Sequence, residues 1–517
     1  MKMGVFHLNS LFMIKRKKNQ CLFAVLFFSV MILIPHFTLA ATFIVNSTTD
    51  AVDANPGDGI CASVGGICTL RAAIMEANAL AGADIITLPA GTYTLTIAGT
   101  GEDAAATGDL DIIDDLTING AGSATTVING NNLDRIFDIR NGVVTISGVT
   151  IRGGNPANDG GGILMRTDLA IYNVSLILTN SVVSNNSATN GGGIFELSGS
   201  LMISDSIING NTSTGIGGGI FNNTGTIMTL TNVTVGMNVA EGDAGGIYNG
   251  GSATLNSVTI NSNVSSAEGG GIFNNGTETM TNTTISANSA TIMGGGIINF
   301  TEGTITNSTI SGNSTTNQGG GIFTGGTLLL TNVTISSNDS GIGGGIFSFG
   351  TETLINVTIN GNNAGDGGGI FNSLQTVSLR NSIITDNLGS NCSGAVTSLG
   401  HNLENGNTCG FTGPGDLSNS NPLLGPLANN GGPTMTHALL PGSPAIDAAD
   451  PTTFPPTDQR GVSRPQGAAP DIGAYELVPT LATTVSVPTM TEWGMIIFMV
   501  LAAVASLHCL RRHRGRF

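Results

Sequence analysis

The carboxylates of the central segment are the groups that could do acid–base chemistry, but they are spread thinly. Hydrolysis of a glycosidic bond needs two or three converging carboxyl groups, and a polysaccharide lyase needs a base, often Arg or Lys. Residues 167–379 contain no Lys, Arg or His. Three glutamates share a position beside a predicted strand start and are interpreted as a solvated edge: Glu278, Glu302 and Glu352. This distribution disfavours catalysis in the segment.

Two groups of oxygen-bearing side chains earlier in the chain could instead bind Ca²⁺. The first includes Asp50, Asp53 and Asp58, although the intervening Asn-Pro-Gly-Asp-Gly is equally typical of a turn. The second consists of Asp109, Asp111, Asp114 and Asp115. Ca²⁺ is the one cofactor considered, and no catalytic residue is assigned.

Side chains of the types found in active sites also occur together near the C-terminus: His401, His437, Asp447, Asp458, Arg460, Arg464 and Asp471. We interpret them as ion pairs and turns that tie a C-terminal cap to the last coil of the fold. An active site is the alternative.

The charge balance excludes a nucleic-acid partner. The 517 residues carry a formal net charge of −17, and no lysine follows Lys18. Binding to phosphates requires a basic face, which this composition does not supply. Because 40% of the residues are apolar and only 10% are charged, the chain can nevertheless bury a core.

A repeat must position these side chains. The segment Gly-Gly-Ile recurs at intervals of 24–31 residues from Ile163 to Ile370. Between copies the pattern alternates with period 2 and is rich in β-branched residues, which predicts strands without helices. Three short strands in each coil predict an all-β fold, a right-handed parallel β-helix over residues 83–400.

Coils stacked about 4.8 Å apart place like residues above one another. The isoleucines therefore predict one internal column, and Leu330 with its equivalents predicts a second. A polar residue at the following bend predicts an inward-facing ladder of amides, formed by Asn232, Asn256, Asn282, Asn307, Asn332 and Asn356. Six residues later a second polar column runs from Asn186 to Asn387, with Asn263 one residue out of step.

The open ends of a solenoid need covering. Thr69 to Leu80 has helical spacing behind a Thr N-cap and predicts an N-terminal capping helix. Close spacing in an oxidising compartment predicts two local disulfides, with a thiolate metal site as the alternative: Cys61–Cys68 and Cys392–Cys409.

Both termini have the composition of targeting segments. Residues 1–40 combine a basic run, an apolar stretch and a small-residue site at Thr38-Leu39-Ala40, which predicts a secretory signal peptide; an uncleaved anchor is the alternative. At the other end, the apolar run 495–510 precedes four arginines. At 1.5 Å per residue this run is short for a hydrocarbon core of ~30 Å.

Two segments resemble domains of secreted bacterial β-helix proteins. Residues 41–82 resemble the CSLREAI-type N-terminal domain through Pro56-Gly-Asp-Gly-Ile-Cys61 and Cys68-Thr-Leu-Arg-Ala-Ala-Ile74, with Thr and Ala replacing the usual Ser and Glu. Residues 401–478 resemble the choice-of-anchor Q domain through Asn430-Gly-Gly-Pro-Thr434, Gly442-Ser-Pro-Ala-Ile-Asp447 and Asp471-Ile-Gly-Ala-Tyr-Glu476. The resemblance implies surface display and no established chemistry.

After a linker at residues 479–486, residues 487–517 resemble the bacterial IPTL-CTERM sorting signal. Its motif residues here are Val487, Pro488, Thr489, Met490, Trp493 and Gly494. The resemblance implies recognition by an exosortase-like membrane enzyme, removal of the hydrophobic helix and delivery to the cell surface. An interfacial anchor is the alternative role for Trp493.

Together these features predict a protein that is secreted across the inner membrane, held transiently by its C-terminal helix and displayed at or released from a bacterial surface. The expected role is structural or adhesive. Its expected partners are signal peptidase, the exosortase-like enzyme, and extracellular polysaccharide or a host surface. The alternative is a carbohydrate-active enzyme, either a polysaccharide lyase or a glycoside hydrolase.

Overall fold

The computed structural model describes residues 40–167, 174–479 and 490–513. They belong to two units, of which the first ends at Glu476 and the second begins at Leu477. The predicted signal peptide up to residue 39, the linker from residue 480 and the motif residues Val487, Pro488 and Thr489 lie outside the described residues.

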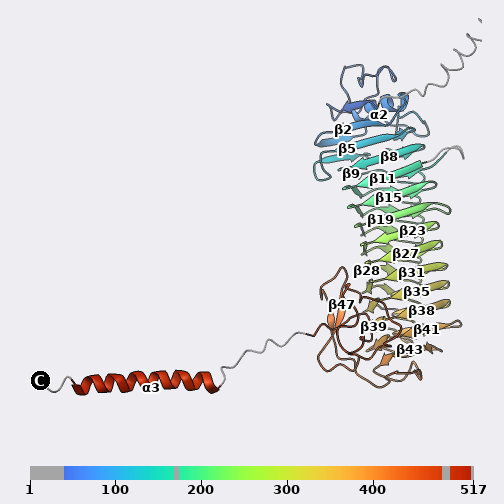
Figure 1. The fold of residues 1–517 in the computed structure, drawn as a ribbon. Helices are drawn as coiled ribbons and strands as arrows, with labels where there is room; N and C mark the ends of the chain where they lie inside the picture. Colours follow the sequence, from blue (N-terminus) through green and yellow to red (C-terminus); the bar gives the residue numbers. More distant parts are fainter. Residues whose placement is uncertain (1–39, 168–173, 480–489, 514–517) are drawn as a thin grey trace, which may run out of the picture. The chain divides into compact units, whose positions relative to one another are not determined.

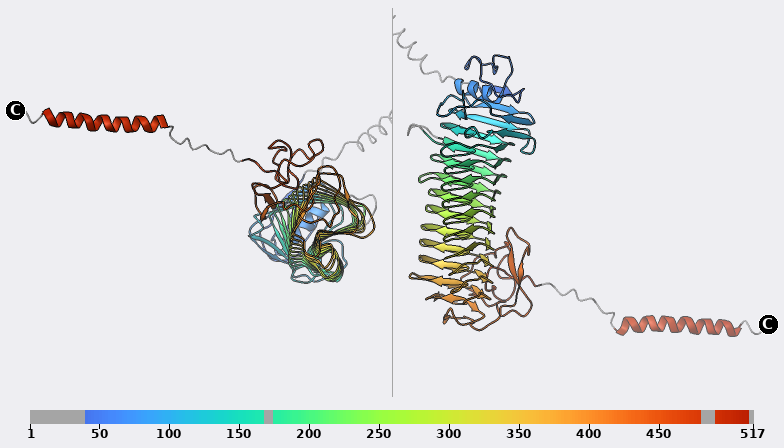
Figure 2. Two further views of the ribbon diagram at one scale, coloured as in Figure 1. Left: turned by 90° about the horizontal axis from the view of Figure 1, so that it is seen from below. Right: turned by 180° about the vertical axis from the view of Figure 1, so that it is seen from behind.

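The first unit is a parallel β-helix, as predicted (Figure 1). A 14-stranded sheet runs from β1 (Thr42–Ile44) to β44 (Thr397–Ser398), and a 12-stranded sheet from β4 (Leu110–Ile112) to β43 (Cys392–Ser393). A 13-stranded sheet runs from β3 (Gly91–Thr94) to β45 (Leu403–Glu404), and a six-stranded strip from β13 (Ser187–Ala188) to β33 (Ser314–Thr315). Seen along the axis, the coils superimpose (Figure 2).

One coil shows how the repeat makes these sheets. Its strands β34 (Ile322–Thr324), β35 (Thr327–Thr331) and β36 (Thr334–Ser336) belong to three different sheets. Ile322 pairs in register with Ile297 of the preceding coil and Ile346 of the next. The predicted isoleucine column is confirmed, because all its members are buried in one continuous core: Ile163, Ile194, Ile220, Ile247, Ile272, Ile297, Ile322, Ile346 and Ile370.

The glycines before each isoleucine serve two purposes. Gly319 has a φ of 70°, a left-handed conformation that glycine adopts without a steric penalty. Gly321 allows close approach, because a Cβ there would lie 2.6 Å from the carbonyl oxygen of Gly345 and 3.0 Å from the amide nitrogen of Asn338. Glycine therefore permits both the turn and the tight stacking of the next coil.

The asparagine ladder inside the solenoid is the second column. Nδ2 of Asn288 donates to Oδ1 of Asn313 (3.0 Å) and to the carbonyl oxygen of Ile260 (2.9 Å), and its backbone N–H donates to the same Oδ1 (3.0 Å). The pattern repeats from Asn186 to Asn387. Asn263 joins it, although its sequence position is one residue out of step.

The prediction that the first asparagine column faces inward is wrong. Its residues make the bend in a left-handed conformation, with φ of 54° at Asn232 and 55° at Asn282, and this conformation turns their side chains outward. Asn232 is exposed, whereas Asn282 and Asn307 are half-buried. Asn332 and Asn356 are buried only where the C-terminal segment covers them.

Asn256 does not belong to that column. It lies in β23 (Ser252–Asn256), where it pairs with Thr231 and Thr281, and Ser257 makes the bend with a φ of 57°. This one-residue shift of the bend explains why the next ladder member, Asn263, is also displaced by one position in the sequence.

Helix α2 (Leu70–Ala79) confirms the predicted capping helix. Oγ1 of Thr69 accepts the N–H of Ala72 (3.1 Å) as the N-cap, and Leu70 joins the core. Asn78 satisfies the otherwise open edge of β4, because its Nδ2 donates to the carbonyl oxygen of Asp111 (2.8 Å). The helix thus closes the N-terminal end of the sheets.

Both predicted disulfides are formed, Cys61–Cys68 and Cys392–Cys409. Cys409 and Phe411 belong to the main core and close its C-terminal end. The segment that follows, with the hairpin β46 (Leu424–Ala428) and β47 (Thr436–Leu439), runs back along the 13-stranded sheet rather than capping the last coil (Figure 1). Thr309, several coils away from the end, donates through Oγ1 to the carbonyl oxygen of Met435 (2.6 Å).

In the second unit, α3 (Met490–His513) contains a 20-residue stretch, Trp493–Arg512, with a mean hydropathy of 2.1. At 1.5 Å per residue this length matches a hydrocarbon core of ~30 Å. By length and composition this 20-residue stretch could therefore span a membrane. It is longer than the apolar run 495–510 because it also includes Trp493, Gly494, Arg511 and Arg512.

Candidate functional site

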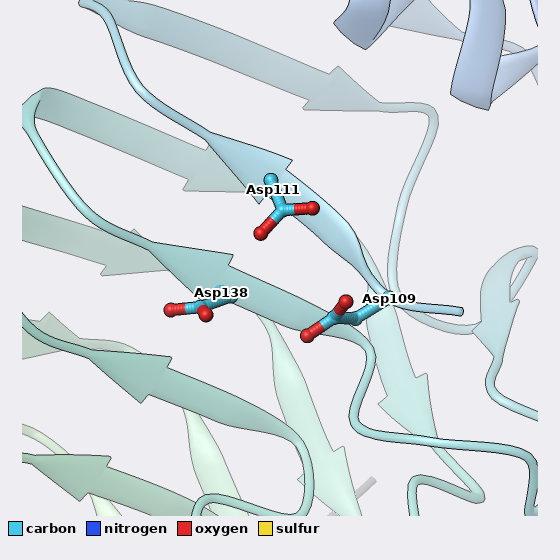
Figure 3. Close-up of side chains that lie close together, drawn as sticks. All are labelled: Asp109, Asp111 and Asp138. Atoms are coloured by element: carbon cyan, nitrogen blue, oxygen red, sulfur yellow. The ribbon is translucent and has the colours of Figure 1, made fainter. Parts of the chain in front are cut away.

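Three buried carboxylates come together on the first coils. Asp109 precedes β4, Asp111 lies within it, and Asp138 on β7 (Phe137–Ile139) pairs in register with Asp111. One oxygen from each lies within 4.8 Å of the others (Figure 3). Of the predicted Ca²⁺ group, Asp114 and Asp115 are not part of this cluster.

Arginines bridge the three carboxylates. Nη1 of Arg135 lies 3.2 Å from Oδ2 of Asp109 and 3.4 Å from Oδ2 of Asp138. Nη2 of Arg166 lies 2.6 Å from Oδ2 of Asp138. Arg140 pairs with Asp103 and lies 4.0 Å from Asp111. The site is therefore an ion-pair network in which guanidinium groups offset much of the carboxylate charge.

Burial dominates the electrostatics of this network. It raises the pKa of Asp109 to about 7, an effect that Arg135 opposes. It raises the pKa of Asp111 to about 8, and the neighbouring Asp109 adds to the shift. Oδ1 of Asp111 has no hydrogen-bond partner. The cluster can hold protons near neutral pH, and its oxygen donors fit a hard cation such as Ca²⁺, but with 0–4% exposure its carboxylates do not face a substrate.

Asp138 is not among the predicted residues, because 27 residues separate it from Asp111. The signal that could have found it is the repeated triplet of one apolar residue, Asp and Ile: Leu110-Asp111-Ile112 and Phe137-Asp138-Ile139. Since equivalent residues of adjacent coils stack in register, these triplets place the two carboxylates side by side.

The carboxylates of the first predicted Ca²⁺ group each contact a different partner. Oδ1 of Asp50 lies 2.7 Å from Nε of Arg71, Asp53 accepts the N–H of Ala62 (2.9 Å), and Asp58 accepts the N–H of Ile60 (2.9 Å). Among the described residues only Asp109, Asp111 and Asp138 form a group with metal-ligand spacing. Binding of Ca²⁺ at residues 50–58 stays a prediction.

The C-terminal group holds its own segment together. Nη1 of Arg464 lies 2.9 Å from Oε2 of Glu476 with both side chains fully buried, and Nε of Arg460 donates to Oδ2 of Asp458 (2.9 Å). His437 donates through Nδ1 to the carbonyl oxygen of Gly425 (2.8 Å). These contacts fix the segment, although Nε of Arg464 is buried without a hydrogen-bond partner.

Three further residues from that group make structural contacts. His401 donates through Nδ1 to the carbonyl oxygen of Ala448 (2.8 Å), and Asp471 accepts the N–H of Asp447 (2.8 Å). Nε2 of His437 lies 3.0 Å from Oγ of Ser336, which ties the segment to the 13-stranded sheet. Burial lowers the pKa of His437.

The interpretation of the three repeat glutamates as a solvated edge is wrong for two of them. Glu278 and Glu352 share an inward-facing column with Leu328 and are buried, whereas Glu302 is one residue out of register and exposed. Burial raises the pKa of Glu278 to about 8 and that of Glu352 to about 7. Glu196, one of the acids interpreted as scattered along the repeat, is also buried, and burial raises its pKa to about 9.

The outer surface carries a different set of groups. A hollow of about 580 Å³ lies where the chain turns into the 14-stranded sheet, lined by Thr226, Thr277 and Thr301 among others, with Glu302 as its one titratable lining residue. Next to Thr301 the ring of Phe300 is 39% exposed, and two coils further on Phe349 is 48% exposed. Glycosidic hydrolysis uses a pair of carboxyl groups, and Glu302 is the one carboxyl group in the lining of this hollow.

Comparisons with known proteins give little guidance. No family model and no curated protein matches the chain. Among solved structures, pectate lyase Pel9A is 15% identical, with a TM-score of 0.38 over 85% of this chain and 97% of that one. The A-module of the mannuronan C-5 epimerase AlgE6 from Azotobacter vinelandii is 16% identical, with a TM-score of 0.37 over 73% of this chain and 95% of that one. The β-helix assignment therefore rests on the strand pairing of the chain itself.

Proposed function

We propose that this protein is a secreted bacterial surface β-helix that binds neutral extracellular polysaccharide without cleaving it. The observation that carries the proposal is the row formed by the hollow, the exposed Phe300 next to it and the exposed Phe349 two coils further on. Aromatic rings offer flat apolar faces against which sugar rings pack, and hydroxyl groups nearby supply hydrogen bonds.

The arrangement of this row suits a linear chain of sugars. Phe300 and Phe349 follow equivalent strands two coils apart, so they are separated by roughly 10 Å along the axis. That separation is comparable to the length of a disaccharide unit. The adjacent sheet adds a row of hydroxyl groups in register: Thr229, Thr254, Thr279 and Thr304.

A carbohydrate-active enzyme is the second candidate function, and the network around Asp109, Asp111 and Asp138 is the observation that favours it. Pectate lyase and mannuronan epimerase, the proteins named in the structural comparison, both act on carbohydrate, but their TM-scores below 0.4 lend this candidate no weight. Burial of the three carboxylates argues against it, because side chains with 0–4% exposure are not accessible to a glycan.

The two candidates separate in one experiment. Purified residues 41–486 are incubated with a panel of polysaccharides, with and without Ca²⁺, and both retention and chain cleavage are scored in the same tubes. Retention without cleavage, at moderate salt, supports the proposal. Cleavage supports the enzyme, and a steep loss of binding with salt contradicts recognition of a neutral glycan.

Two variants locate the binding surface. The double variant Phe300→Ala with Phe349→Ala is expected to weaken retention at least tenfold. The matched control is Val264→Ala, which trims an apolar side chain of similar exposure (42%) on the six-stranded strip. Equal retention by the double variant and the control would place the glycan elsewhere.

For localisation we propose that a signal peptidase removes residues 1–40 and that an exosortase-like enzyme recognises the C-terminal tail. Support comes from the spanning length of α3, the arginines in its last turn and beyond, and the two disulfides, which form in oxidising compartments. In a bacterium that encodes an exosortase, Trp493→Ala is expected to accumulate in the membrane fraction while Met499→Leu is released normally. Identical distributions of the two variants would contradict sorting through Trp493.

A further inference from the structure

The first strand of the fold begins directly after the predicted signal-peptidase site. Ala40 is exposed, and β1 starts two residues later at Thr42. The carbonyl oxygen of Ala41 accepts the N–H of Ile85 (2.9 Å), so Ala41 is already held against β2 (Asp84–Leu88). The Ala40–Ala41 bond therefore lies between an exposed residue and an anchored one.

The nitrogen of Ala41 faces a buried carboxylate. Its N–H donates to Oδ1 of Asp84 (2.7 Å), a residue with 0% exposure. Oδ2 of Asp84 is buried and has no hydrogen-bond partner. Burial raises the pKa of Asp84, and the nearby carboxylate of Asp114 raises it further.

No cation offsets this carboxylate within the described part of the chain. The ion pairs found there involve other acids, and the backbone N–H of Asp84 contacts the carbonyl oxygen of Asp115 (3.2 Å), next to Asp114. A buried carboxylate without a positive partner is costly. While Ala41 stays part of a longer chain, its neutral amide can donate only one hydrogen bond.

We infer that cleavage of the Ala40–Ala41 bond completes a buried ion pair between the new N-terminus and Asp84. This inference rests on the secretion part of the proposed function. Water adds across the amide in a reaction catalysed by signal peptidase: Ala40 leaves as a carboxylate, and the nitrogen of Ala41 becomes an ammonium group. One N–H of the ammonium keeps the bond to Oδ1, and another can reach the unpartnered Oδ2.

The ion pair would lock the edge strand of the 14-stranded sheet. β1 is the edge strand at the N-terminal end of that sheet, because it pairs with β2 on one side only. Processing would therefore consolidate the N-terminal end of the solenoid, where β1 pairs on one side only. Ala41 and Asp84 together form a maturation site at which proteolysis outside the cytoplasm stabilises the fold.

The test compares free and blocked N-termini on the same chain. The protein from Ala41 to its C-terminus is released in detergent from a fusion by a protease that leaves no extra residue, and compared with a form that keeps two added residues. Amide hydrogen exchange of Thr42–Ile44 is expected to be roughly tenfold slower in the first form, corresponding to ~1.4 kcal/mol. N-terminal acetylation, which needs no substitution, is expected to abolish the difference.

A double-mutant cycle assigns the effect to Asp84. In Asp84→Asn the free and blocked forms are expected to exchange at equal rates. Equal rates in the unsubstituted forms, or a difference that persists in Asp84→Asn, would overturn the inference, as would a secreted protein whose first residue is not Ala41. Because the fusion is cleaved in vitro, these outcomes are independent of the polysaccharide experiment.

Discussion

The outward-facing column of the 12-stranded sheet is built in two ways. On the first coils it consists of Asp111 and Asp138, bridged to guanidinium groups. From Phe195 onward the same column consists of stacked rings, interrupted only at Ile298, with centroids 4.4 Å apart for Phe195–Phe221 and 4.8 Å for Phe221–Tyr248. The same position in the coil thus holds either a carboxylate or an aromatic ring. The ring stacks on the equivalent ring of the next coil, and the carboxylate forms an ion pair with an arginine.

The difference follows from the residues that lie above and below each position of the column in the adjacent coils. In the repeat coils a side chain meets an equivalent residue above and below, so identical aromatic rings stack and identical amides share hydrogen bonds. Identical carboxylates would repel, so the acidic version needs the arginines that occur on the first coils and are absent from residues 167–379. The regular region is therefore stabilised by repetition and the irregular region by specific pairs.

The largest expected effect comes from breaking the irregular region. Arg135→Met removes the cation between Asp109 and Asp138, and we expect a loss of about 3–5 kcal/mol in the free energy of unfolding at pH 8, because two buried carboxylates lose a shared partner. Denaturant unfolding measures it. Adding Asp109→Asn should recover part of the loss, and a loss below about 1 kcal/mol would show that the network is not energetically coupled.

The next effect comes from the regular region. Asn288→Ala removes the acceptor of two donors on Asn263, its backbone N–H and its Nδ2, inside the solenoid. We expect a loss of about 2–4 kcal/mol, because buried donors are left unsatisfied. Asn232→Gly, on the exposed outer column, is the control, because glycine keeps the left-handed φ of 54° at that bend, and it should cost less than about 1 kcal/mol. Similar losses for both variants would contradict the assignment of inner and outer columns.

A smaller effect concerns pH. The pKa of Glu278 is about 8 in the folded protein, above its ordinary value of 4.5. Between these values the folded carboxyl keeps a proton that the unfolded chain has lost, so stability falls as pH rises, by about 1.4 kcal/mol per pH unit for this group. Below pH 4.5 and above pH 8 its contribution is flat.

Glu278→Gln cannot ionise and should therefore make the decline between pH 5 and pH 8 shallower. Thermal or denaturant unfolding at several pH values measures the slope. Glu302→Gln is the control, because Glu302 is exposed on the same sheet and should leave the slope unchanged. If both variants changed the slope alike, Glu278 would not be buried.

The smallest expected effect is within the aromatic stack. Phe347→Ile removes ring contacts with Phe323 and Phe371 at 5.2 and 5.1 Å. We expect a loss of about 0.5–1.5 kcal/mol, because Ile298 already occupies the same column without disrupting the fold. A loss as large as that of Arg135→Met would mean that the rings, and not repetition in general, hold the regular region together.

The candidate sites were less predictable than the fold. Asp109 and Asp111 stood out as an acidic group, but their third member, Asp138, comes from the next coil and became visible only through strand register. The exposed rings of Phe300 and Phe349 look like other residues of the repeat until the turn that exposes them is known. The buried position of Glu278 depends on one residue of register, because such a shift exchanges the two faces of a strand.

The sequence by itself determined the coil, the internal isoleucine column, the capping helix and both disulfides, because each depends on local pattern or short separation. Only the tertiary structure decided which asparagines form the inner ladder, since a left-handed φ at one residue turns the first column outward. It also decided that the C-terminal segment runs back along the sheet and that Ala41 meets Asp84. Those contacts join residues far apart in the chain, and no periodicity in the sequence encodes them.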